Sequence, residues 1–144
     1  MLEYGIRNEN ISEASRHMAR VIGIGQQDFA DIRRENLFYI DKTHFIKEWW
    51  ENRDCVTLIT RPRRFGKTLT MSMLEHFFSI KYKDEAELFA GLDIWKDESY
   101  RQMQGTWPVI SLSFANVKEP TYEMAKRRIC QLLTDIYNKN QFLL

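Results

Sequence analysis

The segment that most constrains this chain is residues 61–69, a short loop that joins two different patterns. Residues 55–59 (CVTLI) before it are β-branched and almost wholly apolar, which is typical of a parallel strand buried on both faces. Pro62 ends that strand because it lacks the N–H that a β-ladder requires. After Gly66 the apolar residues recur at helical spacing and predict a helix with one inner face. That face is formed by Leu69, Met73, Leu74, Phe77 and Phe78, and Glu75 and His76 are expected to lie largely outside it.

Other segments extend this pattern. Helices are expected at 28–36, where Asp28 can act as the cap, and from Thr43 through Trp50. Short β-prone runs at 37–40 and 108–114 predict further strands, and a long helix follows Pro120. The order strand, loop, helix, strand, helix predicts an α/β fold of the P-loop NTPase type, with a mostly parallel sheet flanked by helices.

The length of 144 residues suits one domain. Residues 1–25 are expected to form a poorly defined N-terminal extension, with Ser12 capping a short helix. Residues 26–144 are expected to be the N-terminal part of the P-loop domain. Such a sheet needs strands beyond the last helix, so the fold is predicted to be incomplete in this chain, as in a fragment of a longer protein.

Composition narrows the class of protein. The net charge of +1 lacks the large basic excess of many nucleic-acid binders. The two cysteines, Cys55 and Cys130, form no metal-ligand spacing, so they are expected to be buried, reduced thiols in a cytoplasmic protein. No apolar run approaches the roughly 20 residues that span a bilayer, so no membrane partner is expected. The scattered histidines predict no zinc site.

The loop matches the second half of the phosphate-binding pattern G-x-x-x-x-G-K-[ST]. Gly66 lets the backbone approach an anion, and the helix that begins there adds its positive end. Lys67 can reach the β- and γ-phosphates, and the Thr68 hydroxyl is suited to Mg²⁺. Arg61 stands where the first glycine is expected, and Pro62 can take over part of that turn.

Arg63 and Arg64, together with Arg61, can clamp phosphate oxygens through bidentate hydrogen bonds. A GKT tripeptide is weak by itself, and arginines in a loop are usually solvated. The flanking strand and helix patterns favour the functional interpretation. The predicted nucleotide-binding residues, with Lys67 also catalytic and Thr68 also the Mg²⁺ ligand, are Arg61, Pro62, Arg63, Arg64, Phe65, Gly66, Lys67, Thr68 and Leu69.

Three stretches together, 38–43 (FYIDKT), 58–69 (LITRPRRFGKTL) and 108–114 (PVISLSF), resemble the AAA-ATPase-like family. These are bacterial and archaeal proteins, many with a restriction-endonuclease-like nuclease domain at the C-terminal end. The resemblance covers the chain from about Ile22 onward. The string RPRRFGKT is specific, and an arginine in place of the first glycine is usual in that family.

The resemblance implies ATP with Mg²⁺ as the ligand, and an ATPase in the full-length protein. Gly66, Lys67 and Thr68 carry over as nucleotide-binding residues. The family's later acidic strand has no match here, because Asp93 and Asp97 lie in a polar stretch. The base for the attacking water is therefore expected outside this chain, and hydrolysis is not assigned to this chain alone.

Two alternatives remain open for the loop. One is a nucleic-acid-binding module that uses residues 61–67 and the basic run 126–128, although a solvated helix face is the favoured interpretation of that run. The other is an interaction domain with a vestigial phosphate loop. An oligomer is possible. The run 39–43 either places Asp41 or Lys42 near the nucleotide or is a strand end followed by a helix cap, and the cap is favoured.

Overall fold

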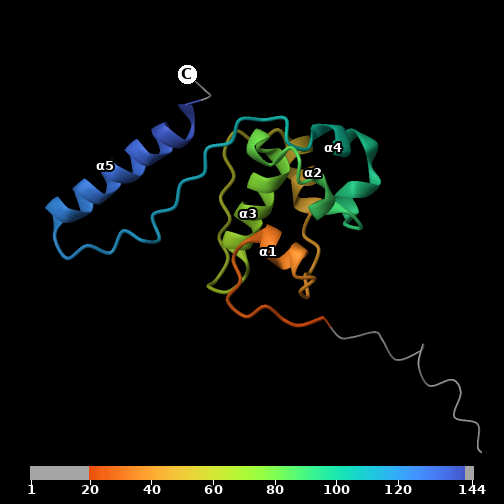
Figure 1. The fold of residues 1–144 in the computed structure, drawn as a ribbon, viewed down its shortest axis with the longest axis horizontal. Helices are drawn as coiled ribbons and strands as arrows, with labels where there is room; N and C mark the ends of the chain where they lie inside the picture. The colour runs from red at the N-terminus through yellow and green to blue at the C-terminus, as the bar shows by residue number, and fades with distance from the viewer. Residues whose placement is uncertain (1–19, 142–144) are drawn as a thin grey trace, which may run out of the picture.

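The computed structural model describes residues 20–141, which fold into helices joined by extended segments (Figure 1). The predicted helix capped by Ser12 begins outside the described residues. The elements, in chain order, are α1 (Phe29–Arg34), α2 (His44–Asn52), α3 (Lys67–Phe78), the 3₁₀ helices η1 (Ile80–Tyr82), η2 (Ala86–Phe89) and η3 (Asp93–Lys96), α4 (Glu98–Met103) and α5 (Tyr122–Lys139).

The predicted α/β fold with a mostly parallel sheet is wrong for the described part of the chain. None of the expected strands at 37–40, 55–59 and 108–114 forms within the described residues. Between residues 20 and 141, the β-pairing is limited to one isolated parallel bridge, Ser79 with Trp107. Val56 and Leu58 are 88% and 81% exposed. An apolar, β-branched composition favours a strand only where neighbouring segments supply ladder partners and cover its faces, and among the described residues the run 55–59 has no ladder partner and is largely exposed.

The core forms around α3. Met73 and Phe77 of this helix are fully buried, and they pack with Phe29 of α1, Ile46 of α2 and Phe89 of η2. The ring centroid of Phe89 lies 5.2 Å from that of Phe77 and 5.0 Å from that of Phe29. Aromatic pairs at these separations add to the stabilisation that comes from burying their area. The predicted inner face of this helix is therefore confirmed at its C-terminal half.

The start of α1 is confirmed at Asp28. Its Oδ1 accepts hydrogen bonds from the backbone N–H groups of Ala30 and Asp31, at 2.8 and 3.2 Å. The long C-terminal helix is also confirmed, although its cap is Thr121. No residue of α5 in the described range is buried, and Figure 1 shows α5 apart from α1–α4 at the end of an extended segment.

The predicted burial is wrong for three side chains. His76 was expected largely outside the inner face of α3 but is only 5% exposed. Its Nδ1 lies 3.1 Å from Glu85 Oε2, and its ring packs on Tyr82. Cys55 and Cys130 are exposed, not buried. Cys55 lies in the run 55–59, which forms no strand. Cys130 lies in α5, none of whose described residues is buried.

Replacing Phe77 with alanine is expected to destabilise the fold by about 3–5 kcal/mol, because a fully buried ring leaves a cavity. Phe65→Ala is the matched control. Phe65 is 58% exposed, so its loss is expected to change the free energy of unfolding by no more than about 0.5 kcal/mol. Urea denaturation of the two variants measures the difference, and equal losses would contradict the proposed core.

Candidate functional site

The loop before α3 curls back on itself. Arg63 and Arg64 form its turn, and Gly66 takes the left-handed conformation, with φ 74° and ψ 24°, immediately before the first residue of the helix. Lys67 Nζ donates hydrogen bonds to the backbone carbonyls of Arg61 and Pro62, the latter at 2.9 Å. The Lys67 side chain therefore closes the loop from its helical end to its beginning.

The arginines of the loop lie at the protein surface. Arg61, Arg63 and Arg64 are exposed, and Arg64 holds a positive φ of 68° that is uncommon for a residue with a side chain. Within residues 20–141, none of the three forms an ion pair with a carboxylate. The loop is thus a concentration of positive charge without a matched negative charge.

A second lysine reaches the same loop. Lys42 Nζ donates a hydrogen bond to the carbonyl of Phe65, at 3.2 Å. A Cβ atom built on Gly66 would lie 3.1 Å from that Nζ. The absence of a side chain at Gly66 therefore serves two purposes here, because it permits the positive φ and leaves room for the Lys42 ammonium.

Asp41, next to Lys42, has a structural role. Its Oδ1 accepts hydrogen bonds from the N–H and the hydroxyl of Thr43, at 2.8 and 2.7 Å, and its Oδ2 accepts one from the N–H of Asp93, at 2.7 Å. Burial raises the pKa of the Asp41 carboxyl, but these donors outweigh burial and lower it overall. Asp41 thus holds the turn before α2, but the favoured interpretation of a strand end followed by a helix cap is wrong, because no strand forms at 37–40 and no side chain caps α2. Lys42 lies at the loop.

Two hollows lie beside the junction of the loop and α3, and each is lined by different residues of the predicted site. The first, of about 430 Å³, is the hydroxyl-lined hollow: Gln27, Asp28, Lys67, Thr68, Met71, Ser72, Glu75, Ser111, Leu112 and Ser113. The second, of about 450 Å³, is the aromatic hollow: Ile22, Phe38, Tyr39, Ile40, Lys42, Arg64, Phe65, Gly66 and Leu69. Arg61, Pro62 and Arg63 line neither of these two hollows.

The hydroxyl-lined hollow contains polar residues that the sequence analysis missed. Ser72 and Glu75 follow the predicted Thr68 at spacings of four and three, which places all three on one face of α3. That spacing was the available signal. Asp28 joins them from the start of α1, and its Oδ2 accepts a hydrogen bond from the Ser72 hydroxyl, at 3.3 Å.

The carboxyl of Asp28 is held in its charged form. Burial raises its pKa, but the N–H groups of Asp31 and Ala30, the charge of His76 and the Ser72 hydroxyl together lower it overall. The hollow beside Thr68 therefore carries a carboxylate at neutral pH. In residues 20–141, no group of three or more His, Cys, Asp or Glu side chains is arranged to hold a metal ion.

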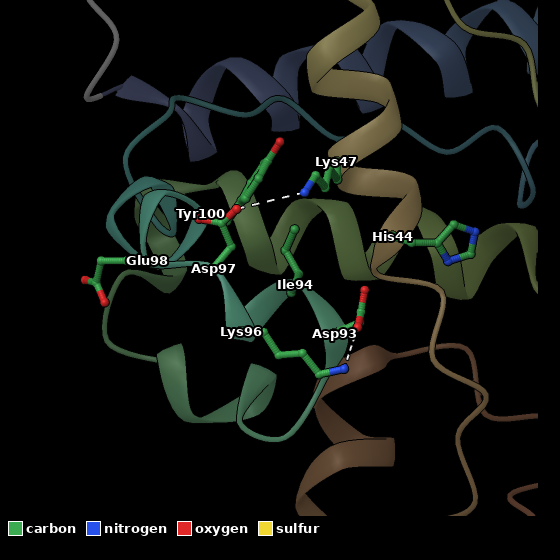
Figure 2. A pocket seen from close by; sticks show the side chains of 8 residues that line it. All are labelled: His44, Lys47, Asp93, Ile94, Lys96, Asp97, Glu98 and Tyr100. Carbon is green, nitrogen blue, oxygen red and sulfur yellow. Dashed lines mark hydrogen bonds and ion pairs between the residues drawn. The ribbon is translucent and has the colours of Figure 1, made fainter.

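A third hollow, of about 410 Å³, lies between α2 and the segment of η3 and α4 (Figure 2). Its cations are matched by carboxylates inside it. Lys47 Nζ lies 3.9 Å from Asp97 Oδ2, and Lys96 Nζ lies 2.7 Å from Asp93 Oδ1. It contains no residue of the loop motif, so it is not the candidate site.

Comparison with known proteins confirms the family resemblance. The family model described as "Predicted AAA-ATPase" matches residues 23–143. The chain belongs to the AAA-ATPase-like family. A curated relative, "Uncharacterized protein in vnfD 5'region" from Azotobacter chroococcum mcd 1, is 31% identical over 112 residues.

That alignment covers 77% of this chain and 20% of the relative, so the chain spans about a fifth of the length of the curated relative it matches. No solved structure matches the chain. Among the helices of residues 20–141, none is long and apolar enough to cross a membrane.

Gly66→Ala is expected to cost about 1–2 kcal/mol because of the positive φ, and also to displace Lys42. Gly91→Ala is the matched control, since Gly91 has φ 78° but no atom near its Cβ position. Urea denaturation of both variants, each with and without Lys42→Ala, isolates the contact. A coupling energy with Lys42 is expected at Gly66 and not at Gly91, and equal coupling at both would contradict the geometry.

Asp41→Asn is expected to destabilise the protein in a pH-dependent way. The folded pKa of Asp41 lies below its ordinary value of 3.8, so its contribution to stability is present above that pH and is lost as pH falls through the folded pKa. The variant should therefore differ most from wild type at pH 7 and least near pH 2. Urea midpoints across this range test this, with the exposed Asp54→Asn as the control. A difference that does not shrink at low pH would contradict it.

Proposed function

We propose that this chain binds ATP together with Mg²⁺ at the loop of residues 61–69, as the nucleotide-binding part of a longer predicted ATPase. Membership in the AAA-ATPase-like family supports the ligand class. The observation that carries the proposal is the position of Lys67. Its ammonium lies in the curl of the loop and is bound only to the neutral carbonyls of Arg61 and Pro62 among the described residues.

A phosphate is a stronger partner for Lys67 than those carbonyls. A phosphate oxygen carries a negative charge that a carbonyl oxygen lacks, so it attracts the Lys67 ammonium more strongly and can displace a carbonyl. Gly66 and the start of α3 add the positive end of a helix dipole beside Lys67. Arg61, Arg63 and Arg64 add charge around the mouth of the loop.

The residues beside Thr68 fit a hydrated Mg²⁺. The Thr68 hydroxyl has no hydrogen-bond partner among the described residues, and it shares its hollow with the Asp28 carboxylate. Mg²⁺ is usually held by one or two protein oxygens together with phosphates and several waters, so a larger cluster is not required. When bound, the ion supplies neutralisation of phosphate charge. Thr68 and Asp28 would hold it or its waters.

Calorimetric titration of ATP with Mg²⁺ tests the proposal. Wild type is expected to bind saturably, and Lys67→Ala to bind about 10–150-fold more weakly, as expected for loss of charged hydrogen bonds worth about 1.5–3 kcal/mol. Lys126→Ala, on the exposed surface of α5, is the control and should bind like wild type.

Titration with single-stranded DNA, beside that with ATP, separates this function from nucleic-acid binding. Binding of single-stranded DNA that falls steeply with salt, without saturable ATP binding, would replace the proposal with the alternative in which the arginines contact backbone phosphates. Binding of neither ligand by folded protein would overturn both and leave an interaction domain.

A further inference from the structure

We propose that Lys42 is a second phosphate-binding lysine of this site. The inference rests on the proposed function, because it assigns Lys42 to the same ligand. Lys67 contacts the carbonyls at the beginning of the loop, and Lys42 contacts the carbonyl of Phe65 at its end. The two ammonium groups therefore reach the loop at opposite ends.

The backbone that carries Lys42 is fixed on both sides. The Tyr39 hydroxyl donates to Met73 Sδ of α3, at 3.2 Å. Asp41 accepts from the N–H of Asp93, and the Thr43 hydroxyl accepts from the N–H of Ile94, at 3.1 Å. Residues 39, 41 and 43 are thus tied to α3 and η3, while Lys42 between them is directed to the loop. A cation held in this way loses little further freedom when it binds a ligand.

The charge of Lys42 has no negative partner among residues 20–141. Lys47 and Lys96 show the contrast, since each lies within 4.0 Å of a carboxylate. The Lys42 ammonium instead has one neutral carbonyl within hydrogen-bond distance, and it is half-buried beside Gly66, where no side chain separates it from the backbone. A half-buried cation with a neutral partner is suited to an anion that arrives with the ligand.

The competing explanation is that Lys42 only braces the loop through its bond to Phe65. Two substitutions separate charge from bracing. Lys42→Gln keeps a hydrogen-bond donor but removes the charge, and Lys42→Arg keeps both. Lys118→Gln, at an exposed position before α5, controls for the loss of one positive charge from the whole chain.

The experiment is calorimetric titration of each variant, as the full chain, with ATP and with inorganic triphosphate, both in the presence of Mg²⁺. Lys42→Gln is expected to weaken both ligands by the same factor of about ten or more, because both carry the phosphates that the ammonium contacts. Lys42→Arg should retain most of the affinity, and Lys118→Gln should match wild type. Melting temperatures without ligand should stay close to that of wild type for all three.

The outcomes distinguish this inference from the proposed function. If wild type binds neither ligand, or if Lys67→Ala binds as well as wild type, the proposed function fails. If binding depends on Lys67 but Lys42→Gln has wild-type affinity for both ligands, only the role of Lys42 is overturned. The brace explanation replaces it if Lys42→Gln and Lys42→Arg lower the ligand-free melting temperature and weaken binding together.

Discussion

Burial of one face of α3 is the constraint on which the rest of the structure depends. Met73 and Phe77 are inaccessible to solvent, and α1, α2 and η2 pack on this helix. Because the interior is close-packed, the helix cannot shift along its axis without opening cavities around these side chains. Its first residue is Lys67, so the same packing that forms the core also fixes where the loop ends.

The candidate site is the loop that ends at Lys67, where positive charge is not matched by negative charge. Two lysines and three arginines surround one loop, and within residues 20–141 the groups bound to the lysines are backbone carbonyls. Protein surfaces usually pair or solvate such charges, as the third hollow does with Lys47 and Lys96. The proposed nucleotide, which brings several anionic oxygens, would resolve this imbalance.

The helices could be predicted because their signals are local. Asp28 caps α1 through N–H groups two and three residues away, and the inner face of α3 follows from residues within the same helix. The strands could not be predicted in this way, because a strand is stabilised by partners distant in sequence. An apolar run such as 55–59 does not specify whether a partner lies beside it. The predictions of burial were wrong for the same reason. Cys55 and Cys130 are exposed although they were expected to be buried, and His76 is buried although it was expected to be outside the core.

The candidate site divides along the same line. The sequence by itself determined the end of the loop, because Gly66, Lys67 and the start of α3 are neighbours in the chain, and the positive φ before the helix is a local requirement that glycine meets. Only the tertiary structure decided that Lys42, rather than Asp41, reaches the loop, and that Asp28 shares a hollow with Thr68. Those placements depend on contacts across 23 and more residues. Such contacts are set by how α1 packs on α3 and how η3 packs on α2, and no spacing within a single segment specifies them.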